Sequence, residues 1–158
     1  MTYRLSAASE KHLEGVHPKL VAVVRRAIQI TKVDFKVIEG VRSKERMWEN
    51  WGKGRTAAQC RAAGVPEKYA QPRLAKVTWL ANPLNSNHRV MADGYGHAVD
   101  LLPAPYNWTE GPKWKLMADA MLEAARELGV QIRWGRDWNR NGKIGEKGET
   151  DGPHFELV

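Results

Sequence analysis

The fold depends on a short apolar stretch in the second half of the chain, Gly96-His-Ala-Val-Asp-Leu-Leu102. Its β-prone, apolar composition after a glycine predicts a strand over residues 97–102. Side chains of a strand point alternately to opposite faces, so His97 and Val99 share one face and Asp100 points to the other. A carboxylate in this apolar setting is costly unless it is paired or bound to a metal. Asp100 is therefore a candidate functional residue.

Helices and short strands surround this stretch in the sequence. Apolar residues at three-four spacing predict a helix that begins at Pro18 and another from Trp114 to Leu128, with Gly129 as its C-terminal cap. Alternating or β-prone residues predict further short strands at Phe35–Glu39, Val77–Leu80, Gln131–Trp134 and His154–Leu157.

The remaining segments are charged or rich in turn residues. Residues 43–63 are helix-prone but strongly charged, and two glycines, Gly52 and Gly54, predict a helix, a loop and a second helix. Asn, Asp, Pro and Gly predict loops at residues 82–96 and 137–152. The pattern indicates an α+β fold, in which a small antiparallel sheet carries helices packed on it.

Length and composition indicate one globular domain. The chain has 158 residues, of which 42% are hydrophobic and 27% are charged, so residues 1–158 can form a single domain with its own core. No apolar run is long enough to cross a bilayer. The segment Met1–Gly15 lacks the apolar core of a secretory signal, so we expect synthesis in the cytoplasm without a signal peptide.

The charge and the cysteine count narrow the classes of partner and site. A net charge of +7 favours polyanions such as nucleic acid, anionic lipid or a cell-wall polymer, but the basic residues are spread along the chain. We find no nucleic-acid-binding motif and expect no nucleic-acid partner. The single cysteine, Cys60, excludes an internal disulfide and a cysteine-based zinc cluster.

The histidines offer ligands for a catalytic metal, which commonly takes three protein ligands. His12 and His17 have no acidic or histidine neighbour at a spacing typical of metal ligands, and we interpret them as surface or capping residues. His88, His97 and His154 belong to the region of loops and strands. The pair Gly152-Pro153 predicts a bend before His154 that brings Asp151 beside it, where a carboxylate can act as a base. The alternative is that His154 is a structural residue.

Several separated segments resemble one family. They are Ser86-Asn-His88, Gly96-His-Ala-Val-Asp-Leu101, Asp151-Gly-Pro-His-Phe-Glu-Leu157, Glu39-Gly-Val-Arg-Ser43 and Ile132–Trp138. Together they resemble the zinc D-alanyl-D-alanine carboxypeptidase and L-alanyl-D-glutamate peptidase family, and most closely its bacteriophage endolysins, which cut the peptide stems of peptidoglycan. The resemblance implies a fold like that of the Hedgehog and D,D-peptidase domains.

The resemblance also implies roles for individual residues. The family's zinc ligands fall on His88, Asp100 and His154. Its general base falls on Asp151, and its transition-state arginine falls on Arg42, for which a surface ion pair with Glu39 or Glu45 is the alternative. The family's serine falls on Ser86, which orients substrate or braces its loop.

One departure from the family concerns the loop after His88. Seven residues, Arg89 to Tyr95, separate His88 from Gly96, whereas the family has two. The longer loop makes Asp93 a rival ligand, although Asp100 holds the family's register. The alternative is that the extra residues form a flap over the substrate groove.

A second segment, Asp137–Ile144, resembles the start of an EF-hand calcium loop. Its oxygen-bearing residues at alternate positions are Asp137, Asn139 and Asn141, and its sixth residue is a glycine. The twelfth position is Gly148 rather than a glutamate, and two lysines oppose a cation. We therefore favour a solvated loop over a Ca²⁺ site, which stays the alternative.

The resemblance predicts an endolysin that hydrolyses an amide bond of peptidoglycan, most consistent with the L-alanyl-D-glutamate bond. The alternatives are a D-alanyl-D-alanine carboxypeptidase and a non-catalytic, zinc-containing module that binds cell walls. We expect a monomer without stable membrane insertion that reaches the periplasm through a holin pore.

Overall fold

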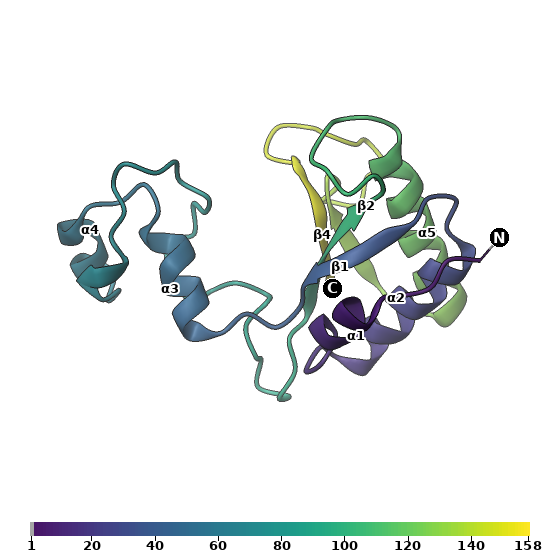
Figure 1. Ribbon diagram of the computed structural model, residues 1–158, viewed down its shortest axis with the longest axis horizontal. Helices are drawn as coiled ribbons and strands as arrows, with labels where there is room; N and C mark the ends of the chain where they lie inside the picture. Colours follow the sequence, from purple (N-terminus) through teal and green to yellow (C-terminus); the bar gives the residue numbers. More distant parts are fainter. Residues whose placement is uncertain (1) are drawn as a thin grey trace.

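The computed structural model describes residues 2–158. In chain order its elements are α1 (Ala7–His12), α2 (Pro18–Ile30), β1 (Phe35–Glu39), α3 (Lys44–Gly52), α4 (Ala57–Ala62), the 3-10 helix η1 (Glu67–Tyr69), β2 (Ala98–Pro103), α5 (Lys113–Leu128), β3 (Ile132–Gly135) and β4 (Asp151–Leu157). The expected α+β fold is confirmed: the four strands form one antiparallel sheet in the order β1-β2-β4-β3, with helices on it (Figure 1).

Helices α2 and α5 cover one face of this sheet. The core consists of apolar side chains from both helices and from alternate strand positions, among them Leu20, Met117, Val99, Leu101 and Phe155. Local signals fix the helix ends: Pro18 occupies the first turn of α2, where the Nδ1 atom of His17 accepts a hydrogen bond from the Lys19 amide. Gly129 ends α5 in the left-handed conformation, with φ of 67°.

The opposite face of the sheet is polar. The register pairs Asp100 of β2 with His154 of β4, and Arg133 of β3 with Glu156 of β4. Directly paired residues of antiparallel strands point to the same face. Four polar side chains therefore lie together on the face that α2 and α5 leave uncovered.

Residues 43–81 form an arm that extends away from the sheet (Figure 1). The arm has a small core of its own, in which Trp51, Cys60 and Val65 are buried. The guanidinium of Arg55 lies 3.9 Å from the ring centroid of Trp51 and donates to the Trp51 and Thr78 carbonyls. The arm thus contains the helix, loop and helix that the glycines at 52 and 54 predicted.

The expected strand at Val77–Leu80 is wrong. The segment belongs to no strand among residues 2–158 and is held instead by side chains of the arm, since the Thr78 carbonyl accepts from Arg55 and the Leu80 carbonyl accepts from the indole of Trp51. A β-prone composition needs a partner strand to become a sheet, and the arm offers side-chain donors in place of one.

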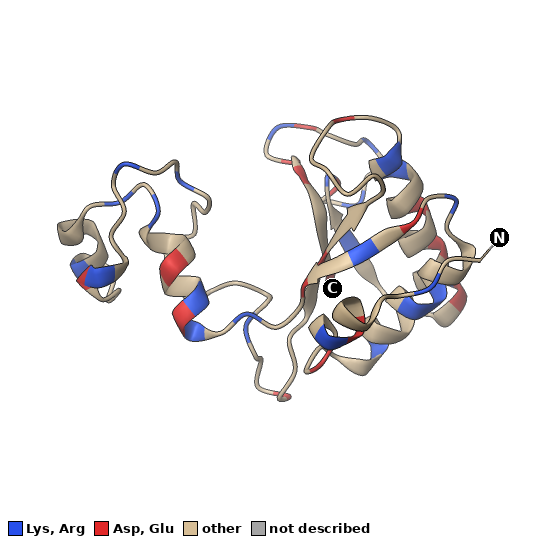
Figure 2. Ribbon diagram, in the orientation of Figure 1, with Lys and Arg blue, Asp and Glu red and all other residues tan. Residues whose placement is uncertain are grey.

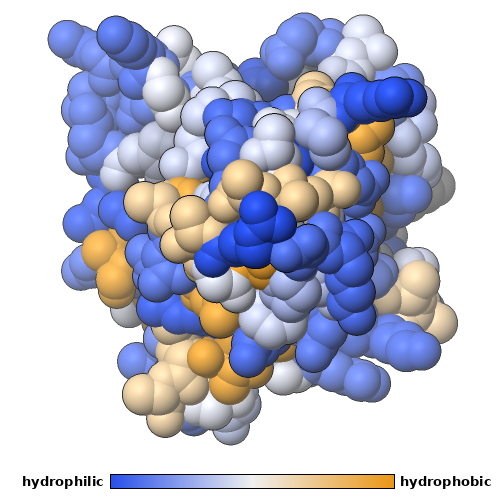
Figure 3. All heavy atoms as spheres, turned by 90° about the vertical axis from the view of Figure 1, so that its left-hand side faces the viewer, coloured by the Kyte–Doolittle hydropathy of each residue, from blue (hydrophilic) through white to orange (hydrophobic). Residues whose placement is uncertain are grey.

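Charge and polarity are distributed broadly over the surface. Figure 2 shows Lys and Arg on the arm, the helices and the loops rather than in one patch. Seen from the arm side, the surface is largely hydrophilic and its hydrophobic spots are separate (Figure 3). Within residues 2–158, no helix is both long and apolar enough to cross a bilayer.

Candidate metal centre

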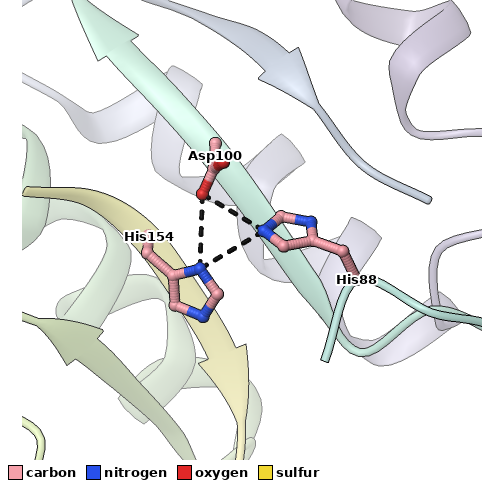
Figure 4. A group of neighbouring side chains, drawn as sticks. All are labelled: His88, Asp100 and His154. Carbon is pink, nitrogen blue, oxygen red and sulfur yellow. Dashed lines mark hydrogen bonds and ion pairs between the residues drawn. The ribbon is translucent and has the colours of Figure 1, made fainter. Parts of the chain in front are cut away.

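Three side chains converge on the polar face of the sheet. Asp100 projects from β2, His154 projects from β4 opposite it, and His88 reaches in from the loop before β2 (Figure 4). The Oδ1 atom of Asp100 lies 3.3 Å from His88 Nε2 and 3.3 Å from His154 Nδ1, and the two nitrogen atoms are 3.3 Å apart. The structure therefore brings together the three residues that the sequence put forward as ligands.

The outer nitrogen of each imidazole fixes the tautomer of its ring. His88 Nδ1 is 2.7 Å from the Gly40 carbonyl oxygen, which can only accept, so Nδ1 carries the hydrogen. His154 Nε2 is 2.7 Å from Glu156 Oε1 and donates to that carboxylate. In the neutral rings, His88 Nε2 and His154 Nδ1 consequently present lone pairs to Asp100.

The donor set and its spacing fit a metal. Asp100 Oδ1 is buried and has no hydrogen-bond partner among the described residues, which is costly unless a cation lies beside it. Three ligands at zinc distances of about 2.0–2.1 Å in a tetrahedral arrangement are separated by about 3.3–3.4 Å. The three observed separations of 3.3 Å match one face of such a tetrahedron and leave a fourth position open.

The pKa values of Asp100 and His154 also indicate that the site favours a bound positive charge. Burial alone would raise the pKa of Asp100, but the adjacent rings of His154 and His88 hold that pKa well below its usual range. Burial would lower the pKa of His154, but the carboxylates of Asp100, Glu156 and Asp151 outweigh it and raise the pKa to about 9. A proton can thus supply the positive charge when no metal is bound.

Glu156 is a candidate site residue that sequence reasoning missed. Its Oε1 accepts from His154, and its Oε2 accepts from Arg133 at 2.8 and 3.0 Å and from Asn87 at 2.5 Å. A carboxylate behind a ligand histidine orients the ring and increases its basicity. Strand alternation was the available signal, because Glu156 stands two residues after His154 and shares its face.

Asp151 lies at the edge of the ligand group because β4 is irregular there. Trp134 pairs with Phe155, but the next residue of β3, Gly135, pairs with Asp151. The bulge carries the Asp151 carboxylate to 4.0 Å from His154 Nδ1. A Cβ on Gly135 would collide with the Asp151 carbonyl, so this close approach needs glycine. Gly152 and Pro153, where the sequence predicted a bend, lie inside β4 at this irregular pairing.

The carboxyl group of Asp151 is accessible from the cleft but is only partly hydrated. Its side chain is half exposed, yet it stands in a concave cleft, and desolvation there raises the pKa of its carboxyl above the ordinary value, with the negative charge of Asp100 adding to the effect. His154 and Arg42 act in the opposite direction. A carboxyl with a raised pKa is better matched to accepting and returning a proton near neutral pH.

Arg42 and Ser86 border the same group. Arg42 donates through Nε and Nη2 to Glu39, each at 2.8 Å, and its Nη2 lies 3.9 Å from Asp100 Oδ2. The Ser86 hydroxyl accepts from the His88 amide at 3.1 Å and lies 3.5 Å from Arg42 Nη1. Arg42 therefore forms the expected ion pair with Glu39 close to the ligand group, its role toward a transition state stays a prediction, and Ser86 braces the His88 loop.

The long loop after His88 closes on itself. Val90 and Gly96 form an antiparallel bridge, and the Met91 amide donates to the Tyr95 carbonyl at 2.8 Å. The two ends of the inserted segment are therefore bonded to each other. Asp93 is exposed and bonds to His97 Nε2 at 2.7 Å, away from the ligand group. The expected flap is wrong, because residues 89–95 do not line the cleft.

The centre lies in a cleft of about 990 Å³. The polar face of the sheet forms one wall, and α3 with the segment Val77–Leu80 contributes to the other. Three tryptophans at 108, 114 and 138 also line it. The cleft is large enough for an extended peptide, and the arm encloses it from the side opposite the candidate metal ligands.

The segment that resembles a calcium loop is held by its own backbone. The Asp137 carboxylate accepts from the Asn141 and Gly142 amides, Asn139 accepts from the Asn141 amide, and Asn141 accepts from the Lys143 amide. These bonds fit the solvated loop that we favoured. Calcium binding there stays a prediction.

Comparison with known proteins extends over the whole chain. The family model for the phage L-alanyl-D-glutamate peptidases matches residues 1–158. The L-alanyl-D-glutamate peptidase of Escherichia phage T5 is 27% identical over 164 residues, covering 100% of both chains. The structure of the L-Ala D-Glu endopeptidase ChiX of Serratia marcescens is similar with a TM-score of 0.62 and 31% identity, covering 98% of this chain and 90% of that one.

Proposed function

The chain belongs to the phage L-alanyl-D-glutamate peptidase family, and on that premise we propose that it is a zinc-dependent endolysin that hydrolyses the L-alanyl-D-glutamate bond of peptidoglycan stems. The observation that supports zinc most directly is the convergence of three potential ligand atoms, His88 Nε2, Asp100 Oδ1 and His154 Nδ1, each 3.3 Å from the other two. We propose further that residues 1–158 form one catalytic domain.

Zinc bound there would lower the pKa of a water molecule toward neutrality and polarise the scissile carbonyl. Asp151 accepts the proton of the attacking water and returns it to the amine of the leaving residue, since its carboxylate borders the ligands and faces the cleft. Arg42, held by Glu39, stabilises the negative charge that develops on the carbonyl oxygen. Glu156 holds His154 in the ligating tautomer.

The test is digestion of purified peptidoglycan by the chain with one equivalent of zinc. The expected products are stems that begin with D-glutamate, together with glycan that retains only L-alanine, identified by mass spectrometry. Chelation should abolish their release, and added zinc should restore it. Metal analysis of the purified protein should give about one zinc per chain.

Two other functions predict different products. Loss of a single D-alanine from the end of the stem would indicate a D-alanyl-D-alanine carboxypeptidase, and bound zinc without any cleavage would indicate a cell-wall binding module. The carboxylate of Asp151 favours catalysis over binding alone, because a structural zinc site does not need a free acid beside it.

We propose that the enzyme acts as a monomer on the cell wall of the host after release through a holin pore. Lysis of cells with a permeabilised outer membrane, compared with intact cells, tests the site of action. Clearing that occurs only after permeabilisation supports attack on the wall from a compartment that the enzyme cannot reach from outside.

A further inference from the structure

Beyond the catalytic group, the cleft contains an arginine to which the mechanism assigns no role. Arg136 follows β3 directly and lines the cleft, and its side chain is 18% exposed. Its guanidinium lies 5.3 Å from the ring centroid of Trp114 and 6.0 Å from that of Trp134. A planar cation packed against aromatic rings is held in one orientation and keeps its charge.

The partner of Arg136 is poorly anchored. Glu110 accepts from Nη1 and Nη2 at 3.1 and 2.9 Å, but its own side chain is 76% exposed and it stands on a loop before α5. Arg136 Nε is buried and has no hydrogen-bond partner among the described residues. An exposed carboxylate gives an ion pair little net stability, so another carboxylate can replace it.

Arg136 lies beside the residue that follows the proposed general base in the chain. A Cβ at Gly152, the residue after Asp151, would lie 2.9 Å from both Nε and Nη2 of Arg136. Glycine at this position therefore lets the guanidinium approach the backbone that carries Asp151. Arg136 therefore lines the cleft beside Gly152.

The other arginines near the centre are committed to carboxylates of the site itself. Arg42 binds Glu39 through two nitrogen atoms, and Arg133 binds Glu156 through two nitrogen atoms. Both partners are at least partly buried, so neither arginine is easily released to a ligand. Arg136 is the cleft-lining arginine whose partner is mostly in solvent.

The proposed substrate carries a negative charge that such an arginine can bind. Glutamate has two carboxyl groups, and only one of them can carry the stem peptide onward, so the other is a free anion close to the bond that is cut. Arginine binds a carboxylate through two parallel hydrogen bonds. We propose that Arg136 binds this free carboxylate, displacing Glu110, and thereby makes the enzyme selective for glutamate over its amidated form. This inference rests on the proposed function.

The test uses two synthetic stem peptides that contain L-alanyl-D-glutamate and differ only in this group, which is a carboxylate in one and a carboxamide in the other. The unaltered enzyme should cleave the carboxylate with a kcat/KM about 10- to 100-fold higher, mainly through a lower KM, as expected for hydrogen bonds to a charged group. Arg136→Gln should abolish this preference and leave cleavage of the carboxamide nearly unchanged.

Glu110→Gln is the matched control, because it breaks the same ion pair but keeps the arginine. It should retain the preference and lower the KM of the carboxylate peptide, since the internal competitor is gone. If the pair is only a structural clamp, the two substitutions should instead reduce activity equally on both peptides. Melting temperatures of both variants separate loss of folding from loss of binding.

The outcomes also separate this inference from the proposed function. Equal cleavage of the two peptides by the unaltered enzyme, or a preference that persists in Arg136→Gln, would overturn the role of Arg136 and leave the peptidase activity in place. Failure of the zinc-loaded enzyme to cleave either peptide between alanine and glutamate would overturn both.

Discussion

The two faces of the sheet use alternate residues of the same strands for different purposes. On β2, Val99 and Leu101 are completely buried under the helices, while Asp100 between them faces the cleft. On β4, Phe155 is in the core, while His154 and Glu156 on either side belong to the candidate metal centre. Neighbouring residues of one strand therefore serve the core and the candidate site in turn. Substitutions on the two faces should accordingly have separable effects on stability and on activity.

The largest effect is expected on the cleft face. Asp151→Asn should reduce kcat by about 10²- to 10⁴-fold, because the amide cannot accept the proton of the attacking water. The zinc content and the melting temperature should change little, since Asp151 is half exposed. Asp119→Asn, which removes an exposed partner of Lys115 on α5, is the control and should retain full activity. Normal turnover by Asp151→Asn would exclude the assigned base.

A substitution on the core face should mainly lower the stability of the fold. Phe155→Ala removes a fully buried ring that stacks on Trp134, and should lower the free energy of unfolding by about 3–5 kcal/mol. Denaturant unfolding measures this change. Leu122→Ala, on the exposed side of α5, should alter stability by less than about 0.5 kcal/mol. An equally small change at Phe155 would contradict the division between the faces.

A smaller effect is expected behind the ligands. Glu156→Gln weakens the acceptor that holds His154 and also serves Arg133 and Asn87, so zinc affinity should fall about 10- to 100-fold. Competition with a chelator measures the dissociation constant. Glu123→Gln, an exposed residue of α5, should leave that constant unchanged. An unchanged affinity in Glu156→Gln would show that the ring needs no such support.

The smallest effect concerns pH. Without zinc, the raised pKa of His154 stabilises the folded chain fully below the unfolded pKa of about 6.5, and this stabilisation is lost as the pH rises through about 9. Zinc replaces that proton, so the increase in melting temperature on adding zinc should be larger at pH 9 than at pH 6. Calorimetry with zinc or with a chelator checks the trend. A constant increment would mean that no proton is displaced.

The sequence predicted the fold where local signals were strong. The cap at Gly129, the proline at the start of α2 and the alternation around Asp100 each depend on residues close in the chain, and the structure has these elements. The prediction failed at Val77–Leu80, because a strand needs a partner and the partners of this segment are arm side chains, those of Trp51 and Arg55.

By itself the sequence determined the element types, the family resemblance and the chemical identity of the ligand candidates, since these follow from local residue order. Only the tertiary structure decided that Asp100 stands opposite His154, that Asp151 reaches the site through irregular pairing between β3 and β4, and that the hairpin after His88 leaves His88 in place. Strand register and loop closure join residues that are distant in the chain, and no local pattern specifies them. The same is true of the contact between Arg136 and Glu110, which brings together two segments 26 residues apart.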